Sequence, residues 1–297
     1  FIAATTSFPE LSTTVSATLK SQPDLAAGNI FGSNLFNIFI LGMVDFYPKN
    51  EVFFKNFNGV RTSHVLTALT GLLITGAYLF GMVIPKSIFV IPSIFSINIL
   101  SIIVFFIYYI GMRETFYYEK QYLENREEEE KYKSITLSKA WFYFIILCGI
   151  IGFIGYYIAN LGNRLDILTG WGETFIGNLF LAVATSLPEL IVSITLIKNG
   201  LFDMLLGDIL GSNIFNLTIL AICDLFYREG SIIFQISSNQ QLAASLSIFL
   251  TGIAIMGIYY QRKGIKRTKF TFGGHSLMII ISYIIGIYII FKISSHQ

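Results

Sequence analysis

Charged residues and cysteines are both scarce in this chain. Only 13% of its 297 residues are charged, whereas a soluble domain carries about 25%. The two cysteines, Cys148 and Cys223, lie in apolar stretches. We expect them to be free core thiols, so no disulfide framework is available and cysteine usage does not indicate a compartment. The three histidines, His64, His275 and His296, are scattered along the chain, which argues against a histidine metal site or a catalytic histidine.

Long apolar segments take the place of charge. Hydrophobic residues make up 54% of the chain, and the longest runs approach the ~20 residues that a helix needs to cross a bilayer. The short strand alternation of a membrane barrel is absent. We therefore expect an all-α polytopic membrane protein. The nine predicted spans are Phe1–Leu19 (entered mid-helix), Leu25–Phe46, Val65–Ile84, Ile88–Gly111, Ala140–Leu161, Gly172–Ile197, Leu201–Phe226, Gln241–Tyr260 and Gly274–Phe291.

One polar unit occurs twice inside this apolar background. Thr6-Ser7-Phe8-Pro9-Glu10 recurs 179 positions later as Thr185-Ser186-Leu187-Pro188-Glu189. The same offset aligns residues 3–45 with residues 182–224 without a gap, and 17 of these 43 positions are identical. In a membrane protein, a duplicated carboxylate-bearing and proline-broken unit is typical of a two-fold cation site near the bilayer midplane.

The repeat also predicts the organisation of the chain. The counterparts of Ala140–Leu161 and of the stretch from Trp171 to Phe175 would precede Phe1, so we expect one helix and the start of the next to be missing from the chain as given. The parent protein would then have two halves of five spans. The first half is 1–112, with motif 3–45, the linker is 113–139, and the second half is 140–297, with motif 182–224.

An odd number of spans in each half requires the two halves to be inverted. When the linker 113–139 is placed inside, the inside segments hold 15 of the 20 Lys and Arg residues and the outside segments hold 5. Because basic residues concentrate in cytoplasmic loops, this orientation is favoured. The linker includes Glu127–Glu130, but four adjacent glutamates lack the spacing of a calcium loop. We expect a solvated helical linker.

The chemistry of the repeated unit favours a hard cation. In a helix, Thr185, Ser186 and Glu189 share one face. Pro188 breaks that helix at a cost of about 3 kcal/mol, and a carboxylate at the bilayer centre adds about 3 kcal/mol. A motif that served only to pack helices together would need neither the helix break nor the buried carboxylate. Freed carbonyls, hydroxyls and a carboxylate together form an oxygen cage that suits Na⁺ or Ca²⁺. Residues Thr6, Ser7, Pro9 and Glu10 repeat the whole arrangement.

The following helix of each unit adds polar and small residues. Ser33 and Asn37, like Ser212 and Asn216, are four positions apart and share a face. The serines are either ligands or interhelical hydrogen-bonding groups, and the same alternatives apply to the asparagines. The pairs Gly28 and Gly32, and Gly207 and Gly211, predict close helix approach. Asp45 and Asp224 fall near span ends, where we expect them to be interfacial.

These two units resemble the α-repeats of the cation/Ca²⁺ exchanger superfamily, in particular the Na⁺/Ca²⁺ exchangers. The resemblance covers the whole chain in layout and is specific at Thr-Ser-x-Pro-Glu and Gly-Ser-Asn-x-Phe-Asn. It implies ten helices in two inverted repeats of five, and exchange of Na⁺ for Ca²⁺. The cation ligands that it implies are the carboxylates of Glu10 and Glu189, groups of Thr6, Thr185, Ser7, Ser186, Ser33, Ser212, Asn37 and Asn216, and the carbonyls of Ala3 and Ala182.

Two positions depart from the family pattern. Some relatives, including K⁺-dependent ones, have Asp where this chain has Asn216, so we expect K⁺ to be dispensable. Asp208 stands where the first unit has Asn29. It either restores a negative charge near the site or acts as a hydrogen-bonding residue behind the ligands.

The predicted function is a secondary antiporter with alternating access. Two carboxylates are neutralised by one Ca²⁺, and two or three Na⁺ compete for the same oxygens. A Ca²⁺/H⁺ antiporter on the same fold is the alternative, a passive channel is a third option, and the motifs of an intramembrane hydrolase are absent. We expect no cofactor beyond the transported ions, no nucleic-acid partner, and a monomeric unit in the lipid bilayer of a cell membrane (plasma or inner) rather than of an organelle.

Overall fold

The computed structural model describes residues 2–46, 62–83, 98–123, 137–227, 230–262 and 274–295, and within these ranges the secondary structure is helical. The first part of the chain contains α1 (Ile2–Thr6), α2 (Phe8–Leu19), α3 (Pro23–Met43), the short helix η1 (Val44–Phe46), α5 (Thr62–Val83) and α6 (Ile99–Leu123). The second part contains α7 (Leu137–Thr169), α8 (Glu173–Ile176), η3 (Gly177–Leu181), α9 (Ala182–Thr185), α10 (Leu187–Lys198), α11 (Phe202–Asp224), α12 (Ile232–Gln235), α13 (Gln240–Arg262) and α14 (Gly274–Ser294).

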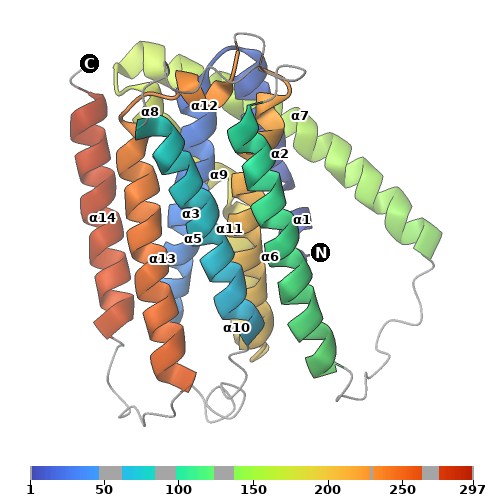
Figure 1. Ribbon diagram of the computed structural model, residues 1–297. Helices are drawn as coiled ribbons and strands as arrows, with labels where there is room; N and C mark the ends of the chain where they lie inside the picture. The colour runs from blue at the N-terminus through green and yellow to red at the C-terminus, as the bar shows by residue number, and fades with distance from the viewer. Residues whose placement is uncertain are drawn as a thin grey trace.

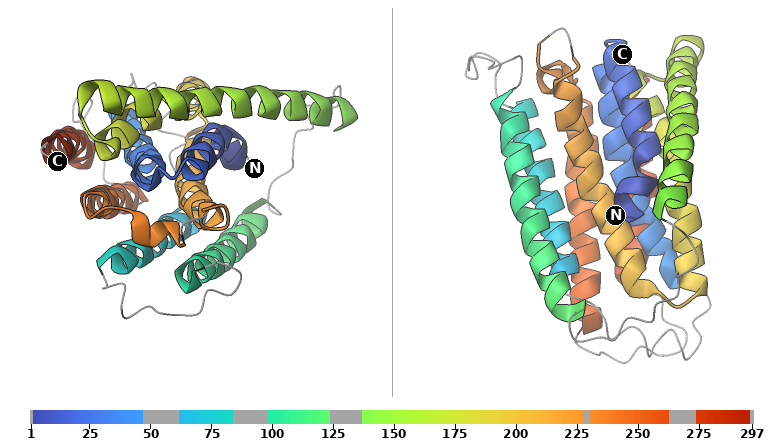
Figure 2. Two further views of the ribbon diagram at one scale, coloured as in Figure 1. Left: turned by 90° about the horizontal axis from the view of Figure 1, so that it is seen from above. Right: turned by 90° about the vertical axis from the view of Figure 1, so that its right-hand side faces the viewer.

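The helices form an elongated bundle in which α3 and α11 lie at the centre (Figure 1). In their most apolar stretches, 89% of the α3 residues and 78% of the α11 residues are buried, compared with 17% in α6. Helix α6 therefore turns an apolar surface outward, as a lipid-facing helix does. The long helix α7 packs against α2 along one side of the bundle, and α5 and α6 lie on the opposite side (Figure 2).

Helices α3 and α11 run in opposite directions. The end of α3 and the start of α11 lie together, because Val44 and Phe202 line the same pocket. At the other end of the bundle, the Asp24 side chain near the start of α3 accepts a 2.8 Å bond from the backbone N–H of Ser237. Asn34 and Asn213 meet where the two helices cross. Two equivalent helices thus cross at the centre with inverted directions.

The expected number of spans is only partly reproduced in the described residues. Six helices are long and apolar enough to cross a membrane: α3, α5, α6, α11, α13 and α14. The bent pair Glu173–Thr185 and Leu187–Lys198 adds a seventh if it counts as one span. The remaining two predicted spans, Phe1–Leu19 and Ala140–Leu161, fall on α1 with α2 and on the 33-residue helix α7. The all-α polytopic membrane fold is confirmed.

The predicted span Ile88–Gly111 is wrong in its bounds. Asn98 is not helical, and α6 runs from Ile99 to Leu123, twelve residues beyond the predicted end. The segment after Gly111 continues with Arg, Glu, Lys and Gln, which are good helix formers, so the helix extends past the apolar stretch. The predicted linker is accordingly helical up to Leu123, and α7 begins at Leu137; residues 124–136, with Glu127–Glu130, lie outside the described residues.

Candidate cation-binding site

Both predicted proline breaks are present. The first separates α1 from α2 at Ser7, and the second separates α9 from α10 at Ser186. In each case proline occupies the second position of the following helix and has no N–H to donate to the carbonyl four residues earlier. The second break bends the chain by 48°. The sequence did not predict the π-helical turn η3, which precedes α9.

The two predicted carboxylates are fully buried, and each accepts a hydrogen bond from the opposite break. The Ser7 hydroxyl donates to Glu189 Oε1 at 3.1 Å, and the Ser186 hydroxyl donates to Glu10 Oε1 at 2.7 Å. Ser33 also donates to Glu10 Oε1, at 3.3 Å. Because Ser7 and Glu10 correspond to Ser186 and Glu189 under the 179-residue offset, the two bonds are equivalent. The breaks are therefore related by a pseudo-two-fold axis.

The predicted threonines obey the same symmetry. Thr6 Oγ1 lies 3.4 Å from Ser212 Oγ, and Thr185 Oγ1 lies 3.4 Å from Ser33 Oγ. Each threonine also donates to a carbonyl three residues earlier: Thr6 to Ala3 at 3.2 Å, and Thr185 to Ala182 at 3.3 Å. The predicted hydroxyls and both predicted alanine carbonyls therefore gather around the two breaks.

Four asparagines join α3 to α11, and sequence reasoning had proposed only two of them as site residues. The side chains of Asn34 and Asn213 each donate to the other's backbone carbonyl, at 3.1 and 3.3 Å. Asn37 donates to Asn213 Oδ1 at 3.0 Å, and Asn216 donates to Asn34 Oδ1 at 3.2 Å. Both missed residues lie inside the repeated Gly-Ser-Asn sequence, so the repeat itself carried the signal.

Four buried acceptor oxygens of this cluster have no hydrogen-bond partner among the described residues. They are Oε2 of Glu10 and Glu189 and Oδ1 of Asn37 and Asn216, and they form two symmetric pairs. All four side chains are 0% exposed. A buried acceptor without a donor is costly, and a cation satisfies several such oxygens at once. Within the described residues, no group of three His, Cys, Asp or Glu side chains could hold a metal ion. Neutral oxygens must therefore complete any cation shell here.

Asn29 and Asp208 occupy equivalent positions but differ in their surroundings. The Asn29 amide donates to Thr14 Oγ1 at 2.9 Å, and Asn29 Oδ1 accepts a 3.1 Å bond from Thr185. Asp208 is 3% exposed, and neither of its carboxylate oxygens has a hydrogen-bond partner among the described residues. The sequence shows that the two positions differ, but it does not assign a role to Asp208.

The predicted close approach at glycine is found mainly in the first unit. A Cβ on Gly32 would lie 2.4 Å from the backbone oxygen of Asn178, and one on Gly28 would lie 2.9 Å from Gly177 Cα. Gly211 is less confined, with Ala3 Cβ at 3.0 Å, and Gly207 makes only an ordinary contact at 3.8 Å. Glycine thus allows α3 to contact the η3–α9 segment directly.

Asp224 lies at the end of α11 as expected, but it is buried instead of facing the membrane interface. It accepts bonds from the backbone N–H groups of Asn98 and Ile232, at 3.0 and 2.9 Å, and from the Ser101 hydroxyl at 2.8 Å. These bonds tie the end of α11 to the segments that precede α6 and begin α12. The side chain of its counterpart, Asp45, lies outside the described residues.

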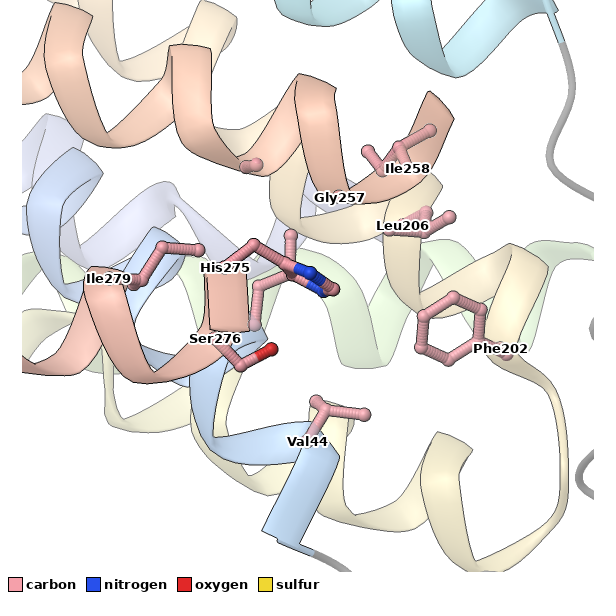
Figure 3. A pocket seen from close by; sticks show the side chains of 10 residues that line it. Val44, Phe202, Leu206, Gly257, Ile258, His275, Ser276 and Ile279 are labelled. Atoms are coloured by element: carbon pink, nitrogen blue, oxygen red, sulfur yellow. The ribbon is translucent and has the colours of Figure 1, made fainter. Parts of the chain in front are cut away.

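A pocket at one end of the bundle is separate from this cluster. It lies where the end of α3 and the start of α11 meet α13 and α14, and its lining includes Val44, Phe202, Leu206, His275 and Ser276 (Figure 3). The lining is mostly apolar and contains no carboxylate. It therefore lacks the ligands of a hard cation, which are found at the two breaks.

Fold and site together define a multi-pass integral membrane protein: an all-helical bundle with paired carboxylates buried at two broken helices. The chain belongs to the sodium/calcium exchanger protein family, whose model matches residues 1–116 and 139–293.

Individual relatives agree with this membership. The inner membrane protein YrbG of Escherichia coli is 27% identical over 218 residues, which cover 72% of this chain and 63% of YrbG. The sodium/calcium exchanger MaX1 of Methanosarcina acetivorans is 32% identical over 119 residues, which cover 38% of this chain and 34% of MaX1. The chain thus matches less than two thirds of the length of either relative. A solved structure of the sodium-calcium exchanger NCX_Mj matches 97% of this chain and 83% of its own, with a TM-score of 0.56 and 22% identity, which shows a shared fold.

Proposed function

We propose that the protein is a secondary antiporter that exchanges Na⁺ for Ca²⁺ by alternating access at the site between the two breaks. The observation that carries this proposal is the symmetric set of four buried acceptor oxygens without donors, on Glu10, Glu189, Asn37 and Asn216. Oxygen ligands of this kind suit Ca²⁺ and Na⁺ and do not suit zinc or copper. The two glutamates carry two negative charges, which one Ca²⁺ neutralises.

The further ligands are the hydroxyls and carbonyls that surround this set. They are Thr6, Thr185, Ser7, Ser186, Ser33 and Ser212, with the backbone carbonyls of Ala3 and Ala182. Two or three Na⁺ occupy the same oxygens when Ca²⁺ leaves. The ions are then coupled because they compete for one cage, without covalent chemistry, so the protein is not an enzyme.

The proposed transport cycle uses the inverted halves, 1–112 and 140–297. Bonds between the two breaks hold the site at the centre, and movement of surrounding helices opens it to one side at a time. A loaded site is neutral or nearly so, whereas an empty pair of carboxylates is costly to carry through an apolar environment. Movement without cargo is therefore disfavoured. The surplus of basic residues near the linker 113–139 favours its placement on the cytoplasmic side of a cell membrane.

The test is ⁴⁵Ca²⁺ uptake by proteoliposomes that contain the full-length protein. The vesicles are loaded with Na⁺ and diluted into Na⁺-free buffer, and parallel samples carry a pH gradient or a K⁺ gradient instead. We expect uptake only with the outward Na⁺ gradient, a Hill coefficient for Na⁺ above one, and no requirement for K⁺. Uptake that follows the pH gradient and ignores Na⁺ would establish the Ca²⁺/H⁺ alternative. Uptake without tracer counterflow would establish a channel.

A further inference from the structure

The two halves of the site are not chemically equivalent, and the difference lies at Asn29 and Asp208. In the first half, the Asn29 amide contacts the Thr14 hydroxyl at 2.9 Å and the backbone carbonyl of Glu10 at 3.5 Å, while its oxygen accepts a bond from Thr185. The side-chain amide of Asn29 is therefore satisfied as both donor and acceptor, so Asn29 itself needs no ion.

In the second half, the residues equivalent to the three partners of Asn29 offer Asp208 only hydroxyls and a backbone carbonyl. The counterparts of Thr14, Glu10 and Thr185 are Ser193, Glu189 and Thr6 under the 179-residue offset. The Asp208 carboxylate has no N–H to donate to the Glu189 carbonyl or to Ser193. Both Asp208 oxygens and Ser193 Oγ are buried without a hydrogen-bond partner among the described residues.

Nothing else in the described surroundings neutralises Asp208. The carboxylates on the neighbouring helices, Glu10 and Glu189, have the same sign. His64 of α5 approaches α11 near Gly207, but its Nε2 is bonded to Asp203 Oδ1 at 2.7 Å. An unpaired buried charge costs several kcal/mol per ion, so a bound cation would stabilise the ionised Asp208 carboxylate.

We propose that Asp208, the Ser193 and Thr6 hydroxyls and the Glu189 carbonyl form a Na⁺ position that has no counterpart in the first half. The inference rests on the proposed exchange function and deepens it. One carboxylate with three neutral oxygens matches a monovalent ion. In the described residues no three acidic side chains converge on one point, so Asp208 does not share a single site with Glu10 and Glu189.

The position changes the charge of the loaded states. With Glu10, Glu189 and Asp208 ionised, three Na⁺ give a neutral site, whereas one Ca²⁺ leaves one negative charge. The Asp208 position therefore retains Na⁺ when Ca²⁺ occupies the pair of glutamates. It also lies near the start of α11, on the side of the α10–α11 turn (Figure 1), so the extra Na⁺ lies off centre between the two faces of the protein.

The first measurement uses the unmutated full-length protein in detergent. Bound ²²Na⁺ is measured at saturating Na⁺ with increasing Ca²⁺. We expect about one Na⁺ per protein to remain at saturating Ca²⁺. Complete displacement of ²²Na⁺ by Ca²⁺ would overturn the proposal. This measurement does not depend on any variant folding.

The second measurement compares variants in proteoliposomes. Asp208→Asn should lower the Hill coefficient for Na⁺ by about one and raise the half-maximal Na⁺ concentration about tenfold, because it removes a charge-assisted contact. Ca²⁺/Ca²⁺ exchange should fall far less than Na⁺/Ca²⁺ exchange. Asp166→Asn on α7, away from the site, is the control for loss of a carboxylate. Failure of the exchange function itself would be evident separately, as the absence of Na⁺-driven uptake by the unmutated protein.

Three results would contradict the Na⁺ position at Asp208. An unchanged Na⁺ dependence of Asp208→Asn would give the residue a purely structural role. Equal losses of both exchange modes in a folded variant would place Asp208 in the Ca²⁺ cage. A change in pH dependence with an unchanged Na⁺ order would identify a proton as the occupant.

Discussion

The contact between α3 and the η3–α9 segment is a sharp test of the packing that positions the site. A Cβ on Gly32 would lie 2.4 Å from Asn178 O, 2.6 Å from Asn178 Cα and 2.7 Å from Ala182 Cβ. Carbon contacts are favourable at about 3.5–4.0 Å, so Gly32→Ala forces the two segments apart by about 1 Å. Two of the three clashing atoms belong to the backbone and cannot rotate away.

The expected cost follows from two opposing effects. Overpacking typically lowers the free energy of unfolding by about 1–3 kcal/mol. Because a Cβ on Gly32 would make three short contacts, we expect its cost to be near the upper end of this range. Replacing glycine by alanine inside a helix stabilises the helix by about 1 kcal/mol. We expect a net destabilisation of about 2 kcal/mol. The displacement would also lengthen the 3.4 Å contact between Ser33 and Thr185, so Na⁺-driven Ca²⁺ uptake should fall together with stability.

The assay is thermal unfolding in detergent, with glycines elsewhere as matched controls. Among the residues that the structure describes, no atom beyond the backbone of α5 itself lies within 4 Å of a Cβ on Gly76, so Gly76→Ala should be neutral or stabilising. Gly211, the counterpart of Gly32, faces only the side-chain atom of Ala3 at 3.0 Å, so Gly211→Ala should cost less than Gly32→Ala. The reasoning is refuted if Gly32→Ala unfolds at the same temperature as Gly76→Ala.

Three further predictions concern the symmetric contacts. Glu10→Gln and Glu189→Gln should each abolish Na⁺-driven ⁴⁵Ca²⁺ uptake while the protein still elutes as a folded species; normal uptake by either variant would remove that carboxylate from the site. Ser7→Ala and Ser186→Ala each remove a bond to a glutamate, worth about 1.5–3 kcal/mol, so Ca²⁺ affinity should fall about tenfold or more; unequal effects would argue against the two-fold equivalence. Asn216→Asp replaces a donor to Asn34 Oδ1 by an acceptor, so it should lower the unfolding temperature without Ca²⁺ and recover with Ca²⁺, as a melting series would show.

The proline breaks and the polar residues that gather at them could be predicted from the sequence because their signals are local. A proline within an apolar span interrupts the helix wherever the span packs. A carboxylate and two hydroxyls within five residues share one face, whatever the tertiary structure. The duplication at a fixed offset then separated these features from chance matches.

The pairings between the halves could not be predicted in the same way. A repeat shows that two units are equivalent, but not that Ser7 of one unit donates to Glu189 of the other. That exchange depends on how α3 and α11 cross, which is where Asn34 and Asn213 form their reciprocal bonds. The end of α6 was missed for a different reason: its sequence remains helix-forming after its apolarity ends, so hydropathy marks the membrane boundary and not the helix boundary.

The symmetry of the contacts bears on how exchange is directed. Because each half contributes the same hydroxyls, carbonyl and carboxylate to the other, a site with exact two-fold symmetry would present equivalent ligands to ions arriving from either face. Such a site would set no direction by itself, and the ion gradients alone would decide which way Ca²⁺ moves. The replacement of Asn29 by Asp208 in the second half breaks this equivalence at one point. If Asp208 holds Na⁺, that ion lies nearer the α10–α11 side, so the order in which Na⁺ binds and leaves should differ between the two faces even though the Ca²⁺ ligands are shared.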